Sequence, residues 1–418
     1  MNESLPTATL GELVELQTEK VFSNKDLRLP YIGLEHIAQG APRLLGTAES
    51  SSSVSVNSLF KRDDILFGKL RPNLKKSLRA PFNGYCSTDI LVLRCHDGVV
   101  PAFAGHVFQW EHVFAAASAT AAGTKMPRTS WSELRRLRVF APKSGSEQSL
   151  IAAVLDTVDE AIAKTEAVIA KLKQVRSGLL HDLLTRGLDE NGELRDPIAH
   201  PEQFQDSPLG WIPKAWDALP LERLAEVDRG KFGHRPRNDP AFYGGDFPFI
   251  QTGDVALAAG ETICDASQRL NERGATVSKE FPLGTIAVTI AANIGDTAIL
   301  GRPMYFPDSV VGVVTGQPHS ARWIELALRR AKTRLNALAP QSAQRNINLE
   351  FLRPLLMPVP KPLEQQRCSA LYESLACQIR IEFRVLEKLK SIKSGLAADL
   401  LTGRVSVPES ILATEAQQ

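Results

Sequence analysis

One stretch of this chain occurs twice in closely similar form. Residues 171–186 read KLKQVRSGLLHDLLTR, and residues 388–403 read KLKSIKSGLAADLLTG. The two starts lie 388 − 171 = 217 residues apart in a chain of 418 residues. A period of half the chain is far too long for a solenoid of short repeats. The sequence therefore predicts two copies of one large unit.

Further blocks pair at nearly the same spacing, with L-R-x-L, P-K and E-Q shared by the best-matched pair. The paired blocks are 133–148 with 351–365, 29–40 with 247–260, and 10–16 with 221–227. The copies agree in these framework blocks and diverge between them. Loops that vary on a common scaffold are where binding residues concentrate.

Each copy ends in a segment whose apolar residues recur every three or four positions, with Lys, Glu and Asp between them. The first seam is Ile151, Leu155, Val158, Ile162, Thr165, Ile169, Leu172, Leu179 and Leu183. The second is Leu371, Leu375, Ile379, Leu386, Leu389, Ile392, Leu396 and Leu400, interrupted near residues 381–383.

Each of these helices is expected to run about 39 residues, or roughly 58 Å. A stripe of that length needs a partner, so we expect residues 147–185 and 363–402 to pair as an antiparallel coiled coil. Two independent amphipathic helices, each covering its own domain, are the alternative.

The remaining sequence looks like mixed strands and short helices, which predicts an α+β fold of two tandem α/β domains with a pseudo-two-fold internal repeat. Strand-like runs are residues 64–67, 89–95, 285–291 and 309–314, and helical runs are 102–118 and 322–339. The expected organisation is a first domain at 1–145, a helix at 146–186, a linker at 187–210, a second domain at 211–362, a helix at 363–404 and a flexible tail at 405–418.

Composition narrows the function class. The formal net charge is +2, so binding to nucleic acid would have to come from local patches. Five cysteines without a CxxC pair favour reduced thiols over a disulfide or zinc framework. Neither a signal peptide nor an apolar run long enough to span a membrane is visible, so we expect a soluble, cytoplasmic protein.

Two variable domains, each followed by a near-identical helix that closes with SGLxxDLLT, resemble the specificity subunit of type I restriction–modification systems. The first copy has KSGSEQ where PLxEQ is usual, so the start of its helix is less well defined. The resemblance implies that each domain is a target-recognition domain reading one half of a split, asymmetric DNA site. It also implies that the helices set the spacer between the halves.

The resemblance further implies that this subunit catalyses nothing by itself and works in phage defence. Its expected partners are double-stranded DNA, two methyltransferase subunits and restriction/translocase subunits, with no membrane. No cofactor is expected on this chain, whereas S-adenosylmethionine, ATP and Mg are expected on the partner subunits.

Local charge agrees with DNA binding. Residues 60–80 hold seven Lys or Arg and two Asp, residues 228–237 hold four against one Asp, and residues 322–334 hold five against one Glu. Such clusters neutralise phosphates while loop Arg, Asn and Gln reach base edges. The DNA-binding candidates are Lys69, Arg71, Asn73, Lys75, Lys76, Arg79, Lys125, Arg128, Lys231, Arg235, Arg237, Gln344, Arg345 and Asn346, with Lys69 and Arg71 the strongest in the first copy. A merely solvated charged face is the alternative for each run.

The repeated helix ends agree at positions that cannot all face one seam on a helix turning 100° per residue. Glycine inside a helix costs about 1 kcal/mol relative to Ala, so a close approach by another backbone is a reasonable cause. We therefore expect two equivalent docking surfaces for a partner, made of Lys171, Ser177, Gly178 and Asp182 and of Lys388, Ser394, Gly395 and Asp399.

The sequence contains no phosphate-binding GxxxxGK[ST] loop, no HExxH, no GxSxG and no amino-methyltransferase N-P-P-[YF] motif. Asp63 and Asp64 before Lys69 look superficially like a nuclease cluster, but a strand-entry turn explains them better. We expect Trp131 to be a core anchor rather than a base-stacking platform, and His36 either touches bases or is a surface histidine with no role. Three other readings stay open: an enzyme with a site spread across both domains, a coiled-coil scaffold that binds no DNA, and the recognition subunit of another split-target restriction class.

Overall fold

The computed structural model describes residues 5–22, 29–48, 56–338 and 346–406. It divides into two compact units, Met1–Ala167 with Phe383–Gln418 and Val168–Glu382. Both units combine helices with mostly antiparallel sheets, which confirms the predicted α+β class. The predicted tail lies outside the described residues from 407 onward.

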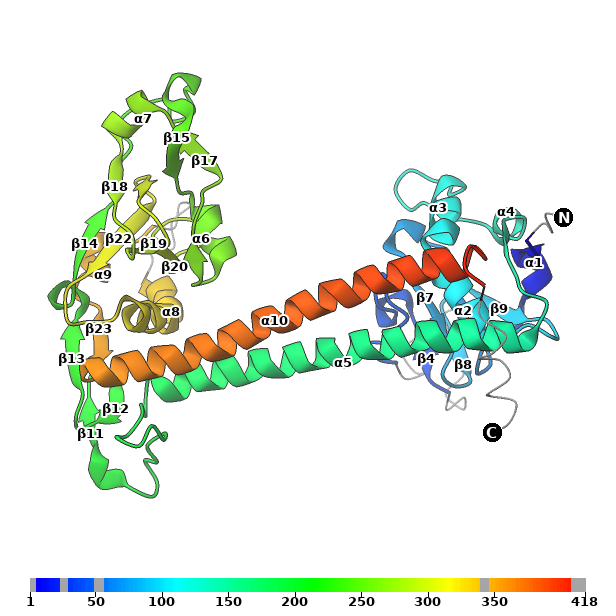
Figure 1. Cartoon of the computed structure of the whole chain (residues 1–418), viewed down its shortest axis with the longest axis horizontal. Helices are drawn as coiled ribbons and strands as arrows, with labels where there is room; N and C mark the ends of the chain where they lie inside the picture. Colours follow the sequence, from blue (N-terminus) through cyan, green and yellow to red (C-terminus); the bar gives the residue numbers. More distant parts are fainter. Residues whose placement is uncertain (1–4, 23–28, 49–55, 339–345, 407–418) are drawn as a thin grey trace. The chain divides into compact units, whose positions relative to one another are not determined.

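Two helices dominate the chain. Helix α5 runs over Gly145–Leu183 and helix α10 over Pro362–Leu400, and each is a single helix of 39 residues (Figure 1). The predicted length is confirmed. Both helices stop before a glycine in the left-handed region, Gly187 with φ 61° and Gly403 with φ 70°, a conformation in which other residues are strained.

The first unit contains two four-stranded sheets, ordered β2-β9-β6-β7 and β3-β5-β8-β4, and the pair β1-β10. Its elements are β1 Thr7–Thr9, α1 Leu10–Leu13, β2 Val14–Leu16, β3 Lys20–Phe22, β4 Tyr31–Ile32, η1 Leu34–His36, β5 Val56–Phe60, β6 Ile65–Gly68, η3 Pro72–Leu74, β7 Ser77–Arg79, β8 Gly84–Cys86, β9 Ile90–Cys95, α2 Pro101–Gln109, α3 Glu111–Ala119, α4 Trp131–Leu134 and β10 Arg138–Phe140. The strands predicted at 64–67 and 89–95 are β6 and β9.

The helix predicted at 102–118 is broken in two. Trp110 has extended backbone angles, φ −69° and ψ 139°, and serves as the C-cap of α2 and the N-cap of α3. Phe108 before the break and Val113 after it are buried in the same core. Hydrophobic periodicity missed the break because both short helices bury their apolar faces in one place.

The second unit contains a five-stranded sheet ordered β14-β22-β19-β20-β16, a four-stranded sheet ordered β17-β15-β21-β18, and the pairs β13-β23 and β11-β12. Its elements are η4 Pro201–Gln203, β11 Phe204–Ser207, β12 Gly210–Pro213, β13 Asp217–Pro220, η5 Leu221–Arg223, β14 Ala225–Arg229, η6 Pro240–Phe242, β15 Tyr243–Phe249, α6 Thr252–Ala258, β16 Thr262–Ile263, β17 Gln268–Leu270, α7 Glu272–Val277, β18 Lys279–Phe281, β19 Ile286–Thr289, β20 Thr297–Leu300, β21 Met304–Phe306, β22 Val310–Thr315, α8 Ala321–Leu338, α9 Leu349–Leu352 and β23 Leu356–Val359. The strands predicted at 285–291 and 309–314 and the helix at 322–339 are β19, β22 and α8.

The repeated leucines at the helix ends belong to hydrophobic cores. Leu400 and Leu401 are buried in the core of the first unit, and Leu183 and Leu184 are buried in the core of the second. Burying such a side chain contributes about 1.5–3 kcal/mol. Core packing therefore accounts for the leucines of the repeated DLLT sequence.

A buried glutamine begins both long helices in the same way. Gln148 Nε2 donates to the Pro142 carbonyl at 2.8 Å, and its Oε1 accepts from the Val100 amide at 2.8 Å. Gln365 Nε2 donates to the Pro360 carbonyl at 2.9 Å, and its Oε1 accepts from the Ser320 amide at 2.9 Å. The start of α5 is thus fixed although its sequence departs from the expected pattern.

Within each unit, segments of α5 and α10 contact one another. In the first unit, Lys393 Nζ lies 2.6 Å from Asp159 Oδ1. In the second, the Arg176 guanidinium lies 6.0 Å from the centre of the Tyr372 ring. The predicted seam is wrong at two positions, because Leu371 and Ile392 are 42% and 41% exposed. Next to Leu371, Tyr372 is buried instead, because one step along a helix rotates the side chain by 100°.

Candidate nucleic-acid interface

Two predicted DNA-facing loops of the first unit adjoin. The loop at 69–76 leaves β6, and the loop at 123–130 leads into α4. The Arg71 amide donates to the Pro127 carbonyl at 2.8 Å, and the Thr129 amide donates to the Lys69 carbonyl at 3.0 Å. Arg71 and Lys75 take left-handed backbone angles, φ 50° and 51°. Strain at non-glycine residues concentrates at functional sites, so this loop pair is the stronger candidate of the first unit.

Some of its polar side chains have no partner within this chain. In the described part of the chain, no hydrogen bond or ion pair engages the side chains of Lys69, Arg71, Asn73 or Lys125. Arg71, Asn73 and Lys125 are exposed, and Lys69 is half-buried. Three unpaired cations on adjoining loops form a surface that attracts phosphate.

Other predicted cations of the first unit are held by the protein itself. Lys75 pairs with Glu111, and Lys76 Nζ donates to the Leu34 carbonyl at 2.6 Å. Arg79 Nε lies 3.8 Å from Asp63 Oδ1. These bonds leave the lysines and Arg79 less available to DNA than the unpaired group.

Arg128 lies against Asp89. Its Nε and Nη2 donate to the two carboxylate oxygens at 2.9 and 3.3 Å, and this pairing raises the pKa of Arg128. Asp89 belongs to the turn before β9, so the ion pair ties the loop at 123–130 to the sheet.

In the second unit, one carboxylate holds two predicted DNA-binding arginines. Arg235 Nη2 lies 3.2 Å from Asp308 Oδ2, and Arg237 pairs with the other oxygen of Asp308. Burial, followed by the nearby charge of Arg235, lowers the pKa of Arg237. Lys231 is exposed, and its ammonium makes no ion pair in the described part of the chain.

The last three predicted DNA-binding residues fall where a described segment begins. Gln344 and Arg345 lie outside the described residues. Asn346 forms a backbone bridge with Ala291 beside β19, and its buried Oδ1 has no hydrogen-bond partner.

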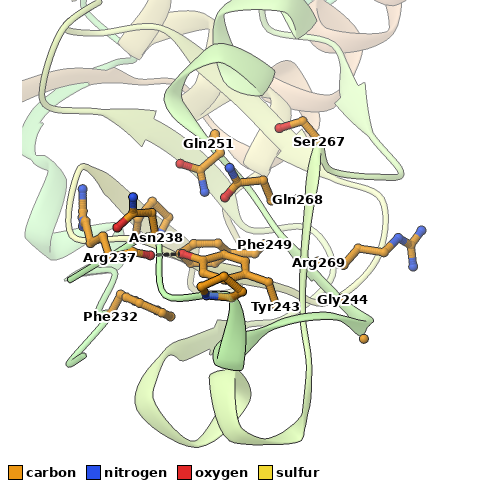
Figure 2. Close-up of a pocket in the computed structure, with 13 residues that line it drawn as sticks. Phe232, Arg237, Asn238, Tyr243, Gly244, Phe249, Gln251, Ser267, Gln268 and Arg269 are labelled. Carbon is orange, nitrogen blue, oxygen red and sulfur yellow. Dashed lines mark hydrogen bonds between the residues drawn. The ribbon is translucent and has the colours of Figure 1, made fainter. Parts of the chain in front are cut away.

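A hollow of about 750 Å³ in the second unit contains polar residues that the sequence did not single out (Figure 2). Asn238, Gln251, Gln268 and Arg269 line it together with Arg237. Three of these side chains are neutral amides, and a search for clustered positive charge passes over them. Asn and Gln in loops and at strand ends, such as Gln251 after β15 and Gln268 at the start of β17, are the signal that could have found them.

The predicted docking residues lie on the outer faces of α5 and α10. A Cβ atom added at Gly178 or Gly395 would meet nothing within 4 Å. Lys171, Ser177, Lys388 and Ser394 are exposed. Asp182 and Asp399 are half-buried and pair with Arg186 at 3.6 Å and Arg404 at 2.8 Å. Among the described residues, no contact within this chain requires glycine at either position.

The nuclease-like pair is structural. Asp64 is 2% exposed, and both of its oxygens accept bonds from Arg94 at 2.8 and 2.7 Å. Among the residues that the structure describes, no cluster of three His, Cys, Asp or Glu could hold a metal ion. Likewise, no described helix is long and apolar enough to cross a membrane.

Two smaller expectations concern single side chains. Trp131 packs against the core of the first unit, with its ring centre 6.4 Å from that of Phe108, as expected of an anchor. His36 Nδ1 accepts a hydrogen bond from the Gly33 amide at 2.9 Å. His36 therefore has a local structural partner.

Comparison with known proteins identifies relatives of this chain. Residues 213–391 match the model of the type I restriction modification DNA specificity domain. Two specificity subunits of type I restriction enzymes from Methanocaldococcus jannaschii are similar: MjaIX is 24% identical over 195 residues, and MjaVIII is 21% identical over 316 residues. These matches cover 45% and 68% of this chain, and only 44% and 66% of the relatives' own lengths.

Two solved structures share the fold. The type I restriction–modification S subunit from M. genitalium superposes with a TM-score of 0.59 at 16% identity, covering 96% of both chains. A chain from a study of assembly and conformational transition in a type I system gives a TM-score of 0.61 at 17% identity, covering 96% of this chain and 100% of that one. The family model, the curated relatives and the shared fold agree in one respect: this chain is similar to the specificity subunits of type I restriction–modification systems.

Proposed function

We propose that this chain is the DNA-recognition subunit of a type I restriction–modification complex, and that each unit reads one half of a bipartite, asymmetric target. The observation that carries the proposal is a shared scaffold with different loops. In the first unit the loop after β6 exposes unpaired cations, whereas the corresponding loop after β19, residues 290–296, has no Lys or Arg. A repeated framework with divergent loops suits two readers of different sequences.

Matching contacts in the two units support an internal repeat. The pairs β1-β10 and β13-β23 are both antiparallel, and each leads into a long helix. Gln148 and Gln365 make corresponding bonds at the starts of those helices. An internal repeat gives a single chain the approximate two-fold symmetry of a dimer while its two reading surfaces differ.

Helices α5 and α10 would then act as a spacer. We propose that they pair antiparallel as a coiled coil along most of their length and fix the distance between the two half-sites. The contacts of Asp159 with Lys393 in the first unit and of Arg176 with Tyr372 in the second support this pairing. A spacer of fixed length makes the distance between half-sites as specific as their sequence.

The partners belong to the same proposal. Two methyltransferase subunits would dock on α5 and α10, and restriction/translocase subunits would join them. S-adenosylmethionine, ATP and Mg would be bound by those subunits, with catalysis on the partners. The open space beside Gly178 and Gly395 supports docking there, because a partner can approach the helix backbone closely at both positions.

Native mass spectrometry tests the docking sites. Bulky substitutions at Gly178 and Gly395 should lower the number of bound methyltransferase subunits from two to one singly and to none together, while the chain stays folded. Two subunits still bound to the folded double variant would overturn the docking proposal.

A selection experiment tests DNA recognition. The chain assembled with its methyltransferase subunits is incubated with random duplex DNA, and the bound fragments are sequenced. We expect two conserved blocks separated by a spacer of constant length and free sequence. Absence of any enriched sequence would favour a scaffold, and a reaction of DNA with the lone chain would favour an enzyme.

A further inference from the structure

The hollow in the second unit lies over a packed cluster of aromatic side chains. Phe232 and Phe249 are each 3% exposed, and their ring centres lie 5.3 Å apart. The Tyr243 ring lies 5.9 Å from that of Phe232, and its hydroxyl donates to the Arg237 carbonyl (Figure 2). The loop on one flank of the hollow is therefore fixed to the aromatic cluster beneath it.

One carboxylate joins two segments on the opposite flank. Asp254 Oδ2 accepts hydrogen bonds from the backbone N–H of Gln251 at 2.8 Å and from the Ser267 hydroxyl at 3.0 Å. Gln268, the next residue, is held in the sheet opposite Phe249. The backbones that carry Gln251 and Gln268 are thus set before any ligand arrives, and preorganisation lowers the entropy cost of binding.

The charges of the hollow are already neutralised. Arg237 pairs with Asp308, and Arg269 Nη2 lies 2.8 and 2.9 Å from the two oxygens of Asp265. Guanidinium groups that are paired within the protein contribute less to phosphate binding than free ones do. The chemistry left to the hollow is hydrogen bonding.

Three carboxamides supply that chemistry. The buried Gln251 Nε2 has no hydrogen-bond partner, and the exposed side chains of Asn238 and Gln268 make no hydrogen bond within the described part of the chain. Figure 2 shows all three around the same space. A buried donor without a partner costs about 1–3 kcal/mol, which a ligand that accepts its hydrogen bond recovers.

We infer that Asn238, Gln251 and Gln268 determine part of the DNA specificity of the second unit by reading A·T base pairs in the major groove. A carboxamide donates one bond and accepts another, which matches N7 and the N6 amino group of adenine. The inference rests on the proposed function and adds to it the residues and the base pairs. It assigns recognition by hydrogen bonds to the hollow of the second unit, in contrast to the free cations of the first unit, which attract phosphate.

Selection from random duplex DNA tests this inference with variants of the assembled complex. Gln268→Ala, Asn238→Ala and Gln251→Ala should each relax the preference for A·T at a position of one half-site, by roughly 5- to 150-fold. The other half-site and the salt dependence of binding should not change, because the substituted side chains carry no charge. Gln203→Ala, an exposed glutamine of the same unit outside the hollow, is the matched control.

A second variant gives a change of preference in place of a loss. In Gln268→Glu the side chain only accepts hydrogen bonds, so the preference at that position should move toward cytosine, whose N4 amino group donates. A thermal unfolding experiment first establishes that the triple alanine variant is folded. The inference is overturned if this folded variant enriches the wild-type motif unchanged. A wild-type complex that enriches no motif overturns the proposed function as well, so the two failures are distinguishable.

Discussion

The loop pair of the first unit and the hollow of the second differ in how they treat charge. Lys69, Arg71 and Lys125 have no partner in the described part of the chain, whereas Arg235 and Arg237 share the carboxylate of Asp308. The loop pair follows a strand of the sheet β2-β9-β6-β7, and the hollow lies on the sheet β17-β15-β21-β18, in which β15 and β21 are parallel. The difference indicates that the two surfaces offer different chemistry, free positive charge in the first unit and uncharged hydrogen-bonding groups in the second.

The starts of the two long helices give a second comparison, of stability. Glu364 near the start of α10 accepts bonds from Arg195 Nη1 at 2.6 Å, Trp216 Nε1 at 3.1 Å and the Leu188 amide at 3.0 Å. Glu147 stands at the matching place of α5, and its carboxylate has no partner in the part of the chain that is described. The repeated glutamate therefore joins several segments of the second unit, whereas in the first unit its carboxylate contributes no described contact.

The largest effect is expected at this glutamate. Glu364→Ala leaves the Arg195 guanidinium, whose side chain is 12% exposed, without a carboxylate partner and should lower the free energy of unfolding by about 3–5 kcal/mol. Glu147→Ala removes no bond and should change it by less than about 0.5 kcal/mol. Denaturant unfolding followed by tryptophan fluorescence measures both, and equal losses would contradict the contrast between the helix starts.

The buried glutamines should behave alike. Gln148→Ala removes two hydrogen bonds, and Gln365→Ala removes the two corresponding bonds and a third, to His319 Nδ1 at 3.3 Å. Each substitution leaves the backbone N–H of a half-buried residue, Val100 or Ser320, without this partner, at a cost of about 1–3 kcal/mol. The same unfolding experiment should give similar losses, and the exposed neighbour Gln366→Ala is the control. A loss at only one glutamine would break the correspondence between the two units.

The smallest effect on stability, and a measurable one on binding, is expected for the free cations. Reversing the charge of Lys69 and Arg71 should weaken DNA binding by the assembled complex, and the slope of log K against log salt should flatten by ~0.9 for each phosphate that is no longer neutralised. Arg237→Ala should flatten it less, because Asp308 already neutralises that charge. The exposed Lys143→Glu serves as the control, and an unchanged slope for the first variant would make its cluster a solvated face.

Repetition made the framework predictable. Apolar spacing and the matched ends placed both helices of 39 residues, and β-branched runs placed β6, β9, β19 and β22. The break at Trp110 was missed, because the apolar pattern continues through it. Local sequence thus predicted elements better than their interruptions.

The candidate site was predictable only in part. Basic residues were found by counting charge, but which of them are free depends on carboxylates far away in sequence. Arg128 is paired with Asp89, 39 residues away, and Lys75 with Glu111, 36 residues away. The amides of the hollow come from three separate segments that only the folded sheet brings together.

The central claim is that the two units read DNA independently, and exchanging one of them tests it most directly. Residues 1–141 would be replaced by the equivalent domain of a relative, and the methylated sites of a host genome would be mapped with the original and the exchanged chain. Independent reading predicts that one half of the target changes while the other half and the spacer length stay the same. A change in both halves, or a change in spacer length, would contradict it.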